Sequence, residues 1–482
     1  MGRNILIWIF FLLLLVWKYI KVLKNYIRCV MFSAFLPGPE GLPFLGNILT
    51  LKNSDRLVDL GTNASQYFGR IFRAWVLFLP FVFVYEPDDL KIILSNSKAS
   101  EKNFLYCIMH TFIGDGLITN NGGKWKQNRR LVQHYFQIHY IENYFDIFAN
   151  ISQEFTANLS TKKCVKITEF VNSLVLNILH KAVLGISSTD DNPFRRGELL
   201  ILKRILKPWL LLETVFKHSD MSKRERRQNI TLHQYVKKVL NERLCERKKK
   251  KIVTSPSLLD YFIELMETTR FSEKDVVNES VTFMLAGQDS VGATIAFTLY
   301  YLAKHQDIQE KLLKEITDVS PENVPYSLDQ INRMTYLEQC IKETMRLAPS
   351  VPIISRVLTS DIVLDNYTLP AGLNVFISPF ITHRLPHIFK NPLNYDPERF
   401  SSENLKKIPS HGFIPYSAGP RNCIGYKFAY LQMKTILATL IKNYRFKLIP
   451  GKENLSFKYR VTLRAKAGIF LEIVPRSKIY VD

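Results

Sequence analysis

The most chemically distinctive stretch of the sequence is a loop around one cysteine, "SAGPRNCIGYKFA" at residues 417–429. A cysteine performs chemistry as a thiolate, either as a nucleophile or as a metal ligand. A nucleophile needs a base beside it, and this loop contains no histidine, although a base distant in the sequence stays open. Cys423 is therefore a candidate metal ligand first and a candidate nucleophile second.

A cysteine that acts as the one protein ligand suits a metal that another group already holds, as the porphyrin holds haem iron. We therefore expect Cys423 to bind haem iron. Gly419 and Gly425 would let the backbone bend close to the porphyrin, and Arg421 would pair with a propionate.

The remaining cysteines lack the close, regular spacing of a zinc site or a disulfide framework. They predict free thiols in a reducing compartment. They are Cys29, Cys107, Cys164, Cys245 and Cys340.

The elements that must position this loop are mostly helical in period, and strand-like runs are fewer, so the sequence predicts a mainly α protein with small β-sheets. The expected helices are 122–137, 167–184, 230–248, 272–304, 327–347 and 424–443. The expected strands lie in 82–85, 361–379 and 461–474.

The longest apolar segment, 271–305, opens with Ser272 and Asp275 in capping positions. Its central part carries one charge, Asp289, so a membrane helix is an alternative interpretation. The cluster Gly-Gln-Asp-Ser-Val-Gly at 287–292 favours a buried core helix that is opened at one point.

The N-terminus predicts a membrane anchor. Residues 5–17 are all apolar; Arg3 precedes them, and four cations follow between 18 and 28. This bias places the rest of the chain in the cytosol, and the lack of a small-residue cleavage site argues against a signal peptide. We expect an anchor with a basic juxtamembrane segment over residues 1–35, then a stiff proline-rich strap at 36–47 that begins a domain over 36–482.

The net charge of +22 suggests a nucleic acid, an anionic membrane face or an acidic protein as partner. The densest basic runs, 222–228 and 245–251, lack interleaved aromatic residues. We interpret them as solvated helix ends and expect no nucleic-acid partner.

The loop and other segments of the chain also resemble those of a known protein family. The run "FIPYSAGPRNCIGYKFA" at 413–429 is similar to the cysteine loop of the cytochrome P450 family, the haem-thiolate monooxygenases, and the similarity continues through nearly the whole chain from the proline strap onward. The runs at 340–356 and 365–389 most resemble the animal microsomal family-four branch. The resemblance implies a P450-type fold, with a long central helix over haem b.

Further site residues follow from that resemblance. It implies a buried lock of Glu343, Arg346 and Arg399 behind the cysteine loop, with Thr335 and Glu338 capping the same helix. It also implies three propionate partners, which are Trp125, Arg129 and Arg356.

On the central helix, Asp289 and Ser290 stand where the family has an acid and an alcohol that relay protons to bound dioxygen. Ser290 replaces the usual threonine and so loses the methyl group that restricts rotation. Ala286 stands where several family-four fatty-acid hydroxylases carry a glutamate esterified to haem, and Tyr416 replaces the usual phenylalanine.

The resemblance implies a monooxygenase of an apolar substrate such as a fatty acid, another lipid, a hormone or a xenobiotic. NADPH would act through a partner flavoprotein reductase, and the enzyme would sit in the endoplasmic reticulum membrane facing the cytosol. Two alternatives are an isomerase or dehydratase of lipid peroxides and a haem sensor or carrier without turnover. The segments 100–120 and 190–225 would line the pocket with residues such as Phe104, Phe112 and Phe216.

Overall fold

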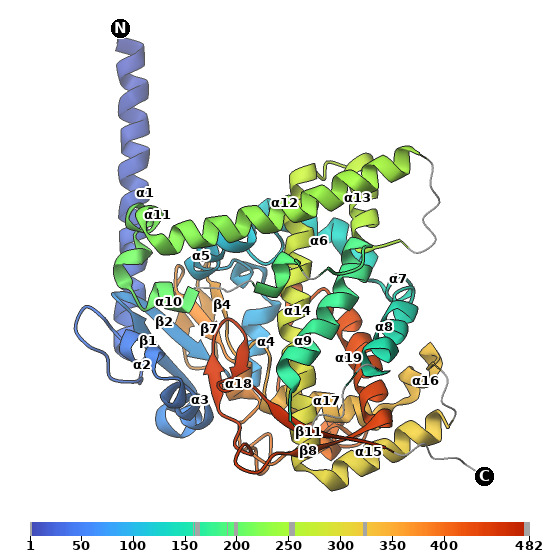
Figure 1. Cartoon of the computed structure of the whole chain (residues 1–482). Coiled ribbons are helices and arrows are strands. Elements are labelled where there is room, and N and C mark those ends of the chain that lie inside the picture. Colours follow the sequence, from blue (N-terminus) through green and yellow to red (C-terminus); the bar gives the residue numbers. More distant parts are fainter. Residues whose placement is uncertain are drawn as a thin grey trace.

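The computed structural model describes residues 2–157, 159, 164–189, 191–196, 201–249, 256–321 and 325–476. Helices gather around α14, the sheet of β1, β2, β4 and β7 lies to one side of it, and α1 projects from the body (Figure 1). The prediction of a mainly α protein with small sheets is confirmed. All six cysteines are free.

The helices are α1 (Gly2–Ala34), α2 (Ile48–Lys52), α3 (Ser54–Phe68), α4 (Pro87–Ser95), α5 (Phe104–Ile113), α6 (Gly122–Gln133), α7 (Ile138–Glu142), α8 (Phe145–Ala157), α9 (Ile167–Leu179), α10 (Ile201–Ile205), α11 (Glu213–His218), α12 (Asp220–Lys248), α13 (Leu258–Thr268), α14 (Glu273–Lys304), α15 (Gln306–Val319), α16 (Leu328–Arg333), α17 (Thr335–Leu347), α18 (Pro379–Thr382) and α19 (Tyr426–Asn443). The strands are β1 (Ile71–Val76), β2 (Leu79–Val84), β3 (Val165–Lys166), β4 (Ile354–Val357), β5 (Ile362–Val363), β6 (Thr368–Leu369), β7 (Asn374–Ile377), β8 (Tyr444–Leu448), β9 (Phe457–Tyr459), β10 (Leu463–Ala465) and β11 (Phe470–Pro475).

Helix α14 is the central element of the core. It begins with a capping box, in which the Ser272 side chain accepts from the Asp275 amide at 3.2 Å and Asp275 accepts from the Ser272 amide at 3.1 Å. Most residues between Val276 and Ala303 are buried, so α14 is a core helix as expected. The helix is continuous, however, and the opening expected at 287–292 is not seen.

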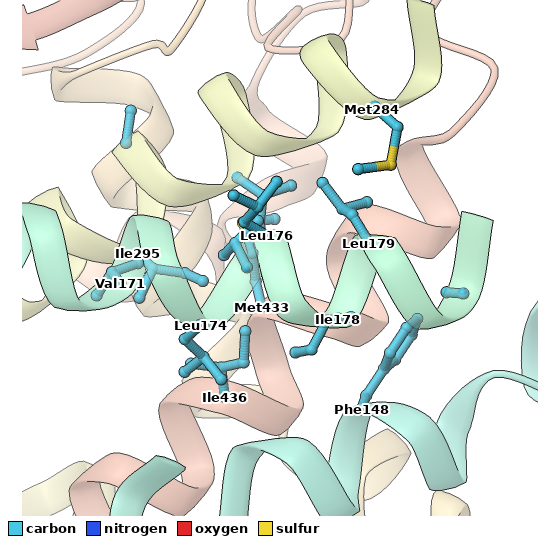
Figure 2. Close-up of a cluster of buried hydrophobic side chains, with 14 of the residues drawn as sticks. Phe148, Val171, Leu174, Leu176, Ile178, Leu179, Met284, Ile295, Met433 and Ile436 are labelled. Atoms are coloured by element: carbon cyan, nitrogen blue, oxygen red, sulfur yellow. The ribbon is translucent and has the colours of Figure 1, made fainter. Parts of the chain in front are cut away.

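Helix α9 packs between α14, α19 and α8 through aliphatic side chains (Figure 2). With the π-helical turn that follows it, the segment Ile167–Leu184 is the one stretch among the described residues long and apolar enough to cross a membrane, and 61% of it is buried. Its position identifies it as a core helix. The packed side chains include Val171, Leu174, Leu179, Met284, Ile295, Met433 and Ile436.

The largest sheet has the strand order β1-β2-β7-β4. Strands β2 and β7 pair in parallel, whereas β1 with β2 and β4 with β7 pair antiparallel. A second sheet has the order β3-β11-β8, and β9 with β10 forms a hairpin beside α14. This hairpin brings residues near 460 to the middle of α14.

Three of the expected helices differ from the prediction. Helix α6 ends at Gln133 rather than 137, and a 3₁₀ turn over His134–Phe136 follows it. Helix α12 begins at Asp220 rather than 230, because the Ser219 side chain accepts from the Ser222 amide and the basic run continues the helix. The segment 327–347 is two helices, α16 and α17, that break at Met334.

The predicted cap of α17 by Thr335 and Glu338 is wrong. The carboxylate of Glu315 in α15 accepts instead from the amides of Tyr336 at 2.6 Å and Leu337 at 2.9 Å. A carboxylate at a helix N-terminus satisfies unpaired amides wherever in the sequence it comes from.

The end of α1 and the proline strap hold the N-terminus on the body. Arg28 forms an ion pair of 2.7 Å with Asp361, and Tyr26 donates to the carbonyl of Phe78 at 3.0 Å. In the strap, Gly46 has φ +61° and exchanges backbone hydrogen bonds with Leu42.

Gly46 and Gly69 both have positive φ, but a Cβ on Gly46 would overlap the Trp75 carbonyl whereas one on Gly69 would meet nothing within 4 Å. We expect Gly69→Ala to cost about 1–2 kcal/mol of unfolding free energy from backbone conformation alone, because its φ of 76° and ψ of −133° lie outside the regions that other residues favour. Gly46→Ala should cost about 3 kcal/mol, since the steric overlap adds to that. Urea unfolding of the two variants measures the difference, and equal losses would show that the strap does not pack as described.

Candidate active site

The cysteine loop contains one short 3₁₀ turn, Gly419–Arg421, and ends where α19 begins at Tyr426. The Cys423 amide donates to the carbonyl of Tyr416 at 2.9 Å, which closes the loop. Gly419 has φ +70°, and a Cβ there would overlap the carbonyl of Leu94 in α4, so this position requires glycine. Gly425 has φ −93°, and a Cβ there would meet only the Phe136 ring, at 3.6 Å, so no protein contact requires glycine at this position.

The thiol of Cys423 faces a cavity of about 520 Å³ with a mostly apolar lining. Burial raises the pKa of the Cys423 thiol, while the Gly425 amide and the Arg129 guanidinium act in the opposite direction. Ala286, Gly287, Asp289 and Ser290 of α14 line the same cavity. The loop thus presents one sulfur to a chamber that α14 also lines.

Helix α6 carries Trp125 and Arg129, and both line the cavity. Arg129 donates to the carbonyl and side-chain oxygens of Asn422 at 2.9 and 2.7 Å, so it also holds the cysteine loop. The guanidinium of Arg421 stacks 3.6 Å over the Trp125 ring and donates to the Ser100 carbonyl at 2.9 Å. Burial lowers the pKa of Arg421 to about 9.

Arg356 differs from the expectation, because it does not line the cavity. It is 2% exposed in β4, donates to the Ser355 carbonyl at 2.9 Å and lies against Tyr106. Lys102 does line the cavity, with its ammonium 3.9 Å from the Tyr106 ring centre.

Four cations at or just behind the cavity wall have no carboxylate at ion-pair distance in the described part of the chain: Lys102, Arg129, Arg356 and Arg421. Burial, with Arg356 and Arg421 nearby, holds the pKa of Lys102 well below its ordinary value. The nearest acid, Glu101, accepts instead from the Gly122 amide. Buried cations of this kind fit an anionic ligand such as the two propionates of haem.

Behind the cysteine loop, Glu343 and Arg346 form a fully buried bidentate ion pair of 2.7 and 2.8 Å. Arg346 also donates to the carbonyls of His383, Pro392 and Asn394. Arg399 approaches Glu343 at 3.6 Å. Burial raises the pKa of Glu343, against the effect of Arg346.

On α14, the Ser290 hydroxyl donates to the carbonyl of Ala286 at 2.8 Å. Asp289 lines the cavity beside it but pairs with Arg464 of β10 and accepts from the Thr462 hydroxyl. The acid and the alcohol are therefore adjacent, and the hairpin holds the acid.

The comparisons with known proteins decide the family. A sequence model of the cytochrome P450 family matches residues 36–471. The chain belongs to the cytochrome P450 family. It is 39% identical to "Probable cytochrome P450 4aa1" of Drosophila melanogaster, over 96% of this chain and 94% of that protein. It is 32% identical to "Cytochrome P450 4c21" of Blattella germanica (88% and 90% of the two chains) and 28% identical to human "Cytochrome P450 4V2" (96% and 91%).

These relatives place this P450 in the family-four branch, as an oxidoreductase of the P450 type. The structure also corrects one expectation about its pocket. Phe104, Phe112 and Phe216 do not line the cavity. Residues 104–113 form a helix, α5, which lines the cavity with Leu105, Tyr106, Met109 and Ile113, so Phe104 and Phe112 lie on its other faces.

Sequence reasoning missed Lys102, Tyr106, Thr462 and Arg464 near the site. Arg464 is 175 positions from Asp289 and carries no motif. One indication for Lys102 was present in the sequence, since this residue lies within the segment 100–120 expected to line the pocket.

The buried ion pair gives a prediction for this P450. Arg346→Met leaves the Glu343 carboxylate buried without its partner, which should cost about 3–5 kcal/mol of unfolding free energy and prevent haem retention. The matched control is Arg333→Met, which breaks an exposed pair with Asp329 at 3.0 Å and should cost about 0.5 kcal/mol or less. Chemical denaturation and the haem content of the purified proteins measure both. Similar losses in the two variants would contradict the assigned role.

Proposed function

We propose that this P450 is a haem-thiolate monooxygenase that inserts one atom of dioxygen into an apolar substrate, with electrons from NADPH delivered by a separate flavoprotein reductase. One observation carries the proposal: the Cys423 thiol and the acid and alcohol of α14 line the same, mostly apolar cavity. Retention of Asp289 and Ser290 favours dioxygen chemistry over peroxide isomerisation, which needs no proton delivery to dioxygen.

Cys423 would hold haem b through its sulfur, and haem bound by a thiolate would supply dioxygen activation, because the sulfur favours O–O cleavage. Arg129, Arg421 and Trp125, with Lys102, would bind the propionates, and Arg356 would support them from behind Tyr106. Gly419 keeps the loop on α4, and Gly425 keeps the side facing haem free of a Cβ. The buried lock of Glu343, Arg346 and Arg399 would hold the segment behind the loop.

In the proposed proton relay, the Ser290 hydroxyl turns from the Ala286 carbonyl toward the cavity and passes on its proton. Asp289, once it has left Arg464 and taken up a proton from solvent, then gives that proton to Ser290 Oγ and returns to the carboxylate. Asp289 must first leave Arg464 and Thr462, so the β9–β10 hairpin takes part in the relay.

For the substrate we propose a fatty acid, another lipid, a hormone or a xenobiotic, because the cavity is mostly apolar. Ala286 lines the cavity and has no carboxylate, so the haem ester implied for several family-four hydroxylases does not form in this chain.

We also propose that residues 1–35 anchor the enzyme in the endoplasmic reticulum membrane, with the domain 36–482 facing the cytosol. Helix α1 projects from the body (Figure 1), and its exposed face includes Trp17, Tyr19 and Ile20. The reductase would dock on basic surface beside the cysteine loop, where Lys126, Arg130 and His134 border a shallow depression.

The function is tested by reconstituting the full chain with NADPH-dependent reductase in vesicles and supplying a panel of fatty acids, steroids and plant terpenoids under ¹⁸O₂. We expect NADPH oxidation and one labelled oxygen atom in a product. Conversion of a lipid hydroperoxide without NADPH would establish the isomerase alternative, and binding without any product would establish the sensor.

Ser290 gives a second prediction. Ser290→Thr restores a β-branched side chain with a narrower range of χ1, so a larger fraction of NADPH electrons should reach product. Ser290→Ala, which has no hydroxyl proton, should reduce that fraction about tenfold or more. The ratio of product formed to NADPH consumed measures both effects. Equal ratios in the wild type, Ser290→Thr and Ser290→Ala would exclude this hydroxyl from the relay.

A further inference from the structure

One buried carboxylate has no part in the haem site or the proton relay. Glu279 lies in α14 two turns before Ala286 and is 0% exposed. Its two oxygens accept from two different segments: Oε2 from the Leu117 amide at 3.0 Å and Oε1 from the Asn128 side chain at 3.2 Å. A buried carboxylate without an ion pair is costly to keep, so these two hydrogen bonds are what stabilise it.

The first partner belongs to the cavity loop, defined here as residues 114–121. Leu117 and Ile118 of this loop line the cavity. The loop is braced internally, because the amides of Thr119 and Asn120 both donate to the Gly116 carbonyl, at 3.0 and 2.9 Å. Because the loop is braced, its attachment to α14 sets the position of the part of the cavity wall that Leu117 and Ile118 form.

The loop also touches α14 directly beside Glu279. A Cβ on Gly116 would overlap the hydroxyl of Thr282 and lie 3.2 Å from the Asn278 carbonyl. At its far end the loop meets the cation cluster, where the Asn120 carbonyl and the Asn121 side chain both accept from Arg421 at 2.9 Å. The second partner of Glu279, Asn128, lies next to Arg129 in α6.

We propose that Glu279 is a positioning residue, which fixes the cavity loop and α6 to α14 and so sets the width of the cavity for long apolar substrates. The inference rests on the proposed function, because it takes this cavity as the substrate pocket. The Glu279 carboxylate does not line the cavity itself and acts through Leu117 and Asn128.

The charge of Glu279 gives a readout that a purely structural contact would not move. Burial raises its pKa to about 7, with Asp275 of α14 acting in the same direction and Lys124 of α6 opposing. Lys124 pairs with Asp115 of the loop at 2.6 Å and with Asp275 at 3.3 Å, and His233 of α12 faces the neighbouring Asn278. Above about pH 7 the carboxylate is ionised, and both of its oxygens accept hydrogen bonds. When it is protonated, one oxygen carries a hydrogen that faces the N–H group of Leu117 or of the Asn128 side chain, and that hydrogen bond is lost.

The test compares two neutral iron ligands, 1,2,4-triazole and 1-dodecyl-1,2,4-triazole, by haem spectral titration of the full-length holoenzyme. The affinity of triazole depends on access to the haem iron alone. The affinity of dodecyl-triazole depends in addition on the contacts between its chain and the cavity wall. We expect Glu279→Gln to weaken dodecyl-triazole binding about three- to tenfold at about pH 8.5, with triazole binding unchanged. In the wild type, dodecyl-triazole binding should weaken between about pH 8.5 and pH 6, and in the variant this dependence should be absent.

Gly116→Ala serves as a second variant, since it displaces the loop without removing the carboxylate. It should weaken dodecyl-triazole binding but keep the pH dependence. The matched control is Asp260→Asn in α13. Asp260 is also a buried carboxylate that accepts a hydrogen bond from a backbone amide, that of Ser257, at 2.8 Å. It should leave the ratio of the two affinities unchanged.

Amide hydrogen exchange of residues 114–121 provides a readout that does not require haem. Exchange of the Leu117 amide should become faster in Glu279→Gln and unaffected in Asp260→Asn. Unchanged exchange at Leu117, or an unchanged ratio of the two affinities, would overturn the proposal for Glu279. Failure of both triazoles to shift the haem spectrum would count against the haem site, and the exchange data would still decide the role of Glu279.

Discussion

The candidate site depends on one electrostatic constraint: cations gather at the wall of an apolar cavity, and none of them has a carboxylate at ion-pair distance among the described residues. Lys102, Arg129 and Arg421 line the cavity, Arg356 lies just behind, and the Cys423 thiol faces the same space. Arg356 is buried and the other three are half-buried, so holding them without a carboxylate partner is unfavourable. In our proposal, a ligand with two carboxylates and an iron atom would offset this cost and bind the sulfur, so that cofactor and protein would stabilise each other.

The surrounding scaffold keeps these groups in place through contacts that cross long stretches of sequence. The Glu343–Arg346 pair joins α17 to the segment before the cysteine loop, and Arg129 and Arg421 tie that loop to the other side of the cavity. Helix α14 provides the opposite wall and is itself fixed by α9 and α19 (Figure 2). Chemistry on a buried centre requires such rigidity, because small displacements of reacting groups carry large costs.

Features that depend on local spacing could be predicted from the sequence. The cysteine loop, the capping box of α14 and the i, i+3 relation of Glu343 and Arg346 all fall within short segments. Contacts between distant segments could not be predicted, because no periodic pattern in the sequence marks them. They include the pair of Arg464 with Asp289, the Glu315 cap of α17 and the attachment of Leu117 to Glu279. The helix α5 was missed as well, and with it the face that lines the cavity.

The central claim is that the sulfur of Cys423 binds haem iron as a thiolate. The most direct measurement is the Soret band of the reduced protein under carbon monoxide, recorded for the wild type and for Cys423→Ser. We expect the strongly red-shifted band of a thiolate-ligated haem in the wild type and its loss in the variant. A wild-type band typical of imidazole or water ligation, or a variant with an unchanged band, would contradict it.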